Sequence, residues 1–251
     1  MKRNINFFFI FFFLVVIDNT NAEDLFHYLE NPDRYIDSLI DAKAESLYYP
    51  AAKFFFEHHK DKTAEKLYKK LIDIDDSLYI ANIYLGHIFL RKPREKIIPL
   101  KHLKQLFNAD DFSKAIEYYS NAEKINPQQP DAYYYQAKAF LSKRSQFHWQ
   151  QGLEKAQQGI LLDSLFKDFL LIRAKLYYRL GQNYFSIRNL TDYLVFCEKE
   201  YTGNVYYYYA LNYHKLKKYD KMTDYYLKAL DIIKDTILMN EIKIGFMPLL
   251  S

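Results

Sequence analysis

The sequence predicts an all-α fold, a solenoid of stacked antiparallel helix pairs. Two residue series support this prediction, and both repeat along the chain at a period in the mid-thirties. In the first series a small residue is followed three positions later by an aromatic one. Its members are Ala52 and Phe55, Gly86 and Phe89, Ala137 and Phe140, Ala174 and Tyr177, and Ala210 and Tyr213. A small side chain lets the two helices of a pair approach closely, and the aromatic ring fills the space beside it.

The second series marks the other helix of each pair. Three residues spaced i, i+4 and i+7 fall on one face of a helix, which can then pack into its neighbours. The series is Ala64, Tyr68 and Leu71; Ala115, Tyr119 and Ala122; Gly152, Ala156 and Gly159; and Met222, Tyr226 and Ala229. In the fourth unit the register stays open, because Ile187, Leu190 and Leu194 form as good a face as the segment Ser186–Tyr193.

These segments resemble the tetratricopeptide repeat (TPR) family, most closely in DDFSKAIEYYSNAEKINP and KKYDKMTDYYLKALDI. The resemblance implies a right-handed superhelix of antiparallel helix pairs, in which the first helix of each pair lines a concave groove. We expect five TPR-like repeats within 45–236, in the units 45–78, 79–129, 130–166, 167–202 and 203–236. Residues 23–44 would add N-terminal helices or a degenerate half-repeat.

The second unit is longer than the others and contains a basic insertion at 91–107. Its basic residues include Arg91, Arg94, Lys101 and Lys104, and its leucines form one apolar stripe after Pro99. A basic amphipathic helix of this kind packs back on the parent fold, contacts a protein partner, or lies on an anionic membrane surface. A smaller insertion in the third unit carries Trp149, the one tryptophan of the chain. The tryptophan is either a core residue or part of a binding loop.

Both ends of the chain are expected to differ from the repeats. Lys2 and Arg3 precede an apolar run at 5–17, and small residues follow at 20–22. This layout is typical of a signal peptide, 1–22, cleaved before Glu23. It predicts an exported protein, periplasmic or extracellular, with an uncleaved N-terminal anchor as the alternative. At the other end, 237–251 would form a capping helix and an apolar tail.

Composition and motifs argue against several classes of function. The chain has 35 basic and 31 acidic residues, a net charge of +4, which is too balanced to indicate nucleic-acid binding. Its single cysteine, Cys197, excludes an intramolecular disulfide. No nucleophile elbow, glycine-rich phosphate loop or metal-binding spacing of His and Cys is present. We therefore expect no enzymatic activity, no cofactor and no metal.

The resemblance also places residues in the predicted groove. Carrying the family's groove positions onto this chain gives one ladder of mainly apolar side chains and one of mainly basic side chains. The groove candidates from these ladders are Tyr49, Lys53, Tyr134, Lys138, Lys175 and Tyr207, and Tyr178 and Arg179 lie one turn further along. One TPR branch clamps a C-terminal carboxylate with Lys, Asn and Arg, but here Lys or His stands where that branch needs Asn.

Aromatic faces flanked by cations suit an extended peptide that carries carboxylates or aromatic side chains. The predicted function is therefore an exported, non-enzymatic scaffold for a protein or peptide partner, an acidic one being the case that the lysines favour. The alternative from another class is a glycan-binding envelope protein that uses exposed tyrosines and Trp149. The chain has 25 tyrosines, although most fall at repeat core positions.

Overall fold

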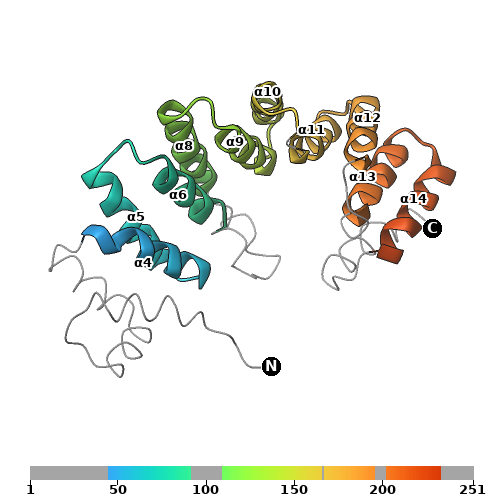
Figure 1. Ribbon diagram of the computed structural model, residues 1–251. Helices are drawn as coiled ribbons and strands as arrows, with labels where there is room; N and C mark the ends of the chain where they lie inside the picture. The colour runs from blue at the N-terminus through green and yellow to red at the C-terminus, as the bar shows by residue number, and fades with distance from the viewer. Residues whose placement is uncertain (1–44, 92–108, 166, 196–201, 233–251) are drawn as a thin grey trace, which may run out of the picture. The chain divides into compact units, whose positions relative to one another are not determined.

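The computed structural model describes residues 45–91, 109–165, 167–195 and 202–232, and all ten elements of regular structure in these ranges are α-helices (Figure 1). They are α4 (Glu45–Glu57), α5 (Asp61–Ile74), α6 (Tyr79–Arg91), α8 (Ala109–Ile125), α9 (Pro130–Ser142), α10 (Gln146–Leu162), α11 (Asp168–Arg179), α12 (Asn183–Leu194), α13 (Thr202–Lys215) and α14 (Tyr219–Ile232). Each of the five expected units holds one pair of them. The signal peptide, residues 23–44, most of the basic insertion, Cys197 and the apolar tail lie outside the described residues.

The chain divides into two compact units, 1–81 and 82–251. In the first unit α4 packs against α5 through a buried seam. Ala52 and Phe55 of α4 are buried in it, as are Ala64 and Tyr68 of α5. Small residues at these positions let the two helix backbones approach, and the aromatic rings fill the remaining space.

In the second unit each helix from α8 to α14 contacts the next one along the chain. Alanine or glycine lies wherever a ring from a neighbouring helix must fit. Gly86 faces the ring of Tyr119, and Gly159 faces the ring of Phe169, both at distances that leave no room for a Cβ atom. Because consecutive pairs pack in this way, each pair covers the apolar face of its neighbour.

The structure settles the register of the fourth pair. Ser186, Leu190 and Tyr193 of α12 are buried, whereas Ile187 and Leu194 are half-buried. Ser186 fits at the most crowded position because its hydroxyl donates to the carbonyl of Ala174 (2.8 Å) and accepts from the Asn212 side chain (2.9 Å). A buried serine with both roles satisfied takes the place that Ala64, Ala115 and Gly152 hold in the first three pairs.

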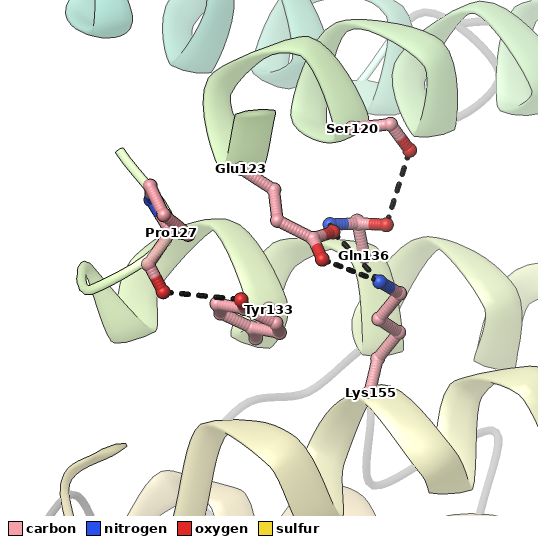
Figure 2. A network of polar contacts seen from close by, with 6 residues as sticks. All are labelled: Ser120, Glu123, Pro127, Tyr133, Gln136 and Lys155. Carbon is pink, nitrogen blue, oxygen red and sulfur yellow. Dashed lines mark hydrogen bonds and ion pairs between the residues drawn. The ribbon is translucent and has the colours of Figure 1, made fainter. Parts of the chain in front are cut away.

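A polar network joins α8, α9 and α10 (Figure 2). Lys155 lies 2.7 Å from both carboxylate oxygens of Glu123, and Gln136 donates to the same carboxylate. Gln136 also accepts a hydrogen bond from Ser120, and Tyr133 donates to the carbonyl of Pro127. Lys155 is therefore neutralised within the fold and is not offered to a partner.

Candidate functional site

The candidate site lies on the first helices of the pairs, α9, α11 and α13, and we call their shared surface the first-helix face. These helices are not consecutive in the chain, yet α11 contacts both α9 and α13. Side chains on one helix can therefore meet those on the next first helix. The predicted ladder residues Tyr134, Lys138, Lys175, Tyr178 and Arg179 belong to this face.

Two tyrosines form the centre of the site, where α11 meets α13. The rings of Tyr178 and Tyr208 meet edge to face, with centroids 5.8 Å apart. Lys175 places its Nζ 5.1 Å from the centroid of the Tyr208 ring. An ammonium over an aromatic face is attracted by the electrons of the ring, so the lysine is held in place by the tyrosine.

Two further cations surround the same tyrosines. Lys215 donates to the carbonyl of Tyr178 (3.3 Å), and its Nζ lies 4.2 Å from the centroid of the Tyr178 ring. Arg179 places its guanidinium 5.8 Å from the centroid of the Trp149 ring. Among the described residues, no carboxylate forms an ion pair with Arg179 or Lys215.

The pKa values of this cluster reflect burial and the positive charge of Arg179. Burial lowers the pKa of Lys215, and the positive charge of Arg179 lowers it further. Burial raises the pKa of Tyr208 to about 12 and also raises the pKa of Tyr178. Both phenols therefore keep their protons at neutral pH and can donate hydrogen bonds, beside two cations that repel each other. A carboxylate or another anion would be stabilised by all four groups.

The α9 part of the face is similar but less cationic. Lys138 lies 5.8 Å from the centroid of the Tyr134 ring, and Tyr134 meets Phe169 edge to face. His87 of α6 packs against Tyr135 and contacts the Tyr119 hydroxyl through Nδ1 at 2.8 Å. Burial, with a contribution from Lys138, lowers the pKa of His87 to about 4. The ring is therefore neutral at neutral pH and adds no charge to the face.

The other predicted residues are Tyr49, Lys53, Tyr207 and the basic residues of the insertion. Tyr49 and Lys53 belong to the first unit, where Tyr49 meets Tyr68 edge to face at 6.4 Å. Tyr207 lies against Tyr208, at a centroid distance of 5.8 Å. Arg91 is the last residue of α6. Arg94, Lys101 and Lys104 of the basic insertion lie outside the described residues.

The structure places Trp149 in a helix and not in a loop, half-buried against the core of its pair. The expected insertion lengthens α10, so Trp149 falls in the first turn of that helix. Its indole nitrogen donates to the carbonyl of Lys143 at 2.8 Å, and its ring packs on the core cluster around Phe169. Of the tyrosines that the structure describes, Tyr184 and Tyr219 are the exposed ones. These positions give little support to a glycan platform built on Trp149.

Tyr208 is a site residue that was not predicted from the sequence. It lies in the run Tyr206–Tyr209, where four consecutive tyrosines face four directions and spacing alone does not show which one meets α11. Lys175 and Tyr178 contact Tyr208, the residue after Tyr207. This contact can be recognised only once α13 is placed beside α11.

Two further kinds of site are absent from the described residues. No group of three or more His, Cys, Asp or Glu side chains within those ranges is placed to hold a metal ion. Among the same residues, no helix has both the length and the apolar character needed to cross a membrane.

Comparison with known proteins gives the fold. No protein-family model matches the chain, and no curated protein matches it. Several solved structures do match. MamA is 16% identical with a TM-score of 0.57, and the match covers 82% of this chain and 97% of MamA. TTC0263, a thermophilic TPR protein of Thermus thermophilus, is 15% identical with a TM-score of 0.56, covering 82% of this chain and 98% of TTC0263.

A third match is YrrB, a TPR protein with an unusual peptide-binding site. It is 13% identical with a TM-score of 0.56, and the match covers 83% of this chain and 97% of YrrB. The predicted fold class, an all-α solenoid of antiparallel helix pairs, is thereby confirmed, and so is the resemblance to TPR proteins at the level of the fold.

Proposed function

We propose that this chain, which has the fold of TPR proteins, is a non-enzymatic scaffold that binds an acidic segment of a protein partner on its first-helix face. The proposal rests chiefly on one observation: Arg179 and Lys215 lie beside Tyr178 and Tyr208, and no described carboxylate pairs with either cation. The likeness to YrrB, which has a peptide-binding site, supports the class of partner.

The chemistry of the cluster favours a carboxylate ligand. Arg179 and Lys215 repel each other, so an anion between them removes an unfavourable interaction and adds two favourable ones. The two protonated phenols can donate to the same anion. The aromatic faces around them offer contact area to apolar side chains that flank the carboxylate.

A binding measurement with defined peptides tests the proposal. The probes are fluorescein-labelled peptides with alternating Glu and Phe residues, and matched peptides in which every Glu is replaced by Gln. We expect the Glu peptides to bind, and the variant Arg179→Gln/Lys215→Gln to weaken that binding by about 100-fold or more, since it removes two charge-assisted bonds of about 1.5–3 kcal/mol each.

The matched control removes two cations elsewhere. The variant Lys217→Asn/Lys218→Gln lowers the net charge by the same amount at exposed positions outside the cluster. It should bind the Glu peptides nearly as well as the unmodified chain. Equal losses in the two variants would mean that only net charge matters, and would contradict a site at Tyr178 and Tyr208.

We also propose that the chain reaches this partner outside the cytoplasm. The basic start and the apolar run at 5–17 support export, and cleavage before Glu23 would reduce the mass by about 2.7 kDa. Comparison of precursor and exported chain by mass spectrometry tests this. A precursor that keeps residues 1–22 in the membrane fraction would contradict the cleaved form.

A further inference from the structure

A second surface of the 82–251 unit has an unusual composition, and it lies at the turns between the two helices of three consecutive pairs. We call it the turn edge and define it as residues 143–147, 180–185 and 216–219. These three segments contain four basic residues, Lys143, Arg144, Lys217 and Lys218, and no acidic residue. The turn edge therefore has a net positive charge, which its first and third segments supply.

The same segments expose large aromatic side chains. Phe147 is 63% exposed, Tyr184 68%, Phe185 55% and Tyr219 54%. Exposing a ring to water is unfavourable, so four exposed rings on one edge suggest a partner that covers them. Contacts at their bases hold the rings in place: Phe185 stacks on Tyr177 at 5.4 Å, and Phe147 meets His148 edge to face.

Contacts between the pairs show that the three turns are neighbours. Lys218, in the third turn, places its Nζ 5.9 Å from the centroid of the Tyr184 ring in the second. Arg179, at the start of the second turn, reaches the ring of Trp149, whose indole donates to the carbonyl of Lys143 in the first. The three turns therefore follow one another along one edge, with cations in the first and third and exposed rings in all three.

We propose that the turn edge docks on an anionic phospholipid surface. Lys and Arg side chains are attracted to anionic headgroups, while Phe and Tyr rings favour the boundary between headgroups and acyl chains. Each turn supplies at least one exposed ring, and the first and third turns supply the cations. Charges and rings spread in this way suit a fluid surface that offers many equivalent headgroups. A neutral glycan would leave the four cations without a role.

Partitioning onto vesicles tests this proposal with the full chain. The probes are vesicles of phosphatidylcholine alone and vesicles that contain about one-third phosphatidylglycerol. All variants share the apolar run at 5–17, so its own membrane affinity is common to every arm, and the differences between variants report on the turn edge. We expect tighter binding to the anionic vesicles.

Two variants of the turn edge separate its charge from its rings. Lys217→Asn/Lys218→Gln should lower partitioning onto anionic vesicles by about tenfold or more, since each basic residue near such a surface contributes a factor of about five. Asn suits position 217 because Lys217 has a φ of 57°, a conformation that Asn tolerates. Phe147→Ser/Tyr184→Ser should weaken binding to both kinds of vesicle, because it removes rings that insert.

The matched control is Lys124→Gln/Lys228→Gln, which removes two cations near the far ends of second helices. It should partition like the unmodified chain. Lys217→Asn/Lys218→Gln should lose partitioning onto anionic vesicles yet keep the binding of the Glu peptides, which separates this proposal from the proposed peptide site. Unchanged partitioning of both turn-edge variants would overturn the proposal. The proposal would also be overturned if the chain did not bind anionic vesicles and the turn-edge variants instead lost binding to an acidic protein.

Discussion

At the scale of single residues, the turns of three helix pairs share one conformation. His59, Gly181 and Lys217 each lie two residues after a first helix ends, and all three have φ between 57° and 75°. In each turn the amide after this residue donates to a carbonyl five positions back, as Lys218 does to Tyr213 at 2.9 Å. This bonding closes the helix with a Schellman motif, which favours glycine at the left-handed position.

Lys217 occupies the left-handed position of its turn, where a side chain causes backbone strain that glycine avoids. We expect Lys217→Gly to raise the free energy of unfolding by up to about 1 kcal/mol, because a side chain in the left-handed region is strained by about 1–2 kcal/mol and glycine loses part of the gain through backbone entropy. Urea denaturation followed by circular dichroism measures the change. Lys217→Ala is the control: it removes the lysine and keeps the strain, so a gain in this variant would contradict the explanation.

His87 makes the fold sensitive to pH. Its pKa is about 4 in the folded chain, below its ordinary value of 6.5, so the folded state prefers the neutral ring. Its stabilising contribution is complete above about pH 6.5 and is lost as the pH falls toward 4. The charged and titratable groups that contact or act on the ring are Lys138, Tyr119, Tyr135 and Tyr84.

Replacing this histidine should flatten the pH profile. For His87→Gln we expect the fall in unfolding free energy between pH 6.5 and 4 to shrink by an amount on the order of 2–3 kcal/mol. Thermal or urea unfolding at a series of pH values measures it. A slope that persists in His87→Gln would place the pH sensitivity elsewhere.

At the scale of helices, the fourth pair is distinguished by a buried polar contact. Asn212 of α13 donates to Ser186 of α12 (2.9 Å) and to the carbonyl of Tyr208 (2.6 Å), and both side chains are fully buried. Hydrogen bonds of this kind are directional, so they fix the register in which α12 meets α13. An apolar face formed by Ile187, Leu190 and Leu194 offers no such bond.

A double-mutant cycle tests the coupling of these two residues. Ser186→Ala leaves Asn212 with one acceptor fewer in the interior, and we expect it to lower the unfolding free energy by about 1–3 kcal/mol. In the background Asn212→Ala the same change should cost much less, giving a coupling energy of about 1 kcal/mol or more. Additive effects of the two substitutions would show that the bond does not stabilise the α12–α13 contact.

The helices could be predicted from sequence because their determinants are local. Small residues such as Ala137 and Ala174 recur with an aromatic three positions later, and this spacing marks a helix face wherever it occurs. The site was harder to predict because its contacts join helices that are not consecutive. Tyr208 meets Lys175 only after α13 lies beside α11, and His87 loses its charge only after it is buried against Tyr135.

At the scale of the whole molecule, the stability of the 82–251 unit depends on contacts between consecutive pairs. Each pair packs only on its neighbours, so one weakened contact can separate the unfolding of the two sides. Gly159 of α10 lies at such a contact. A Cβ atom built there would overlap the ring of Phe169, a fully buried residue of α11.

We therefore expect Gly159→Ala to destabilise the contact between the third and fourth pairs. Alanine favours a helix over glycine by about 1 kcal/mol, but overpacking against a buried ring costs about 1–3 kcal/mol and should prevail. Hydrogen exchange followed by mass spectrometry measures the effect. In this variant the backbone amides of α9 and α10 should exchange at rates different from those of α11 and α12. Glu154→Ala, at an exposed position of α10, should leave the pattern unchanged. Adding Phe169→Leu should restore part of the protection, because the smaller side chain makes room for the new methyl group, and a failure to restore it would contradict the overpacking explanation.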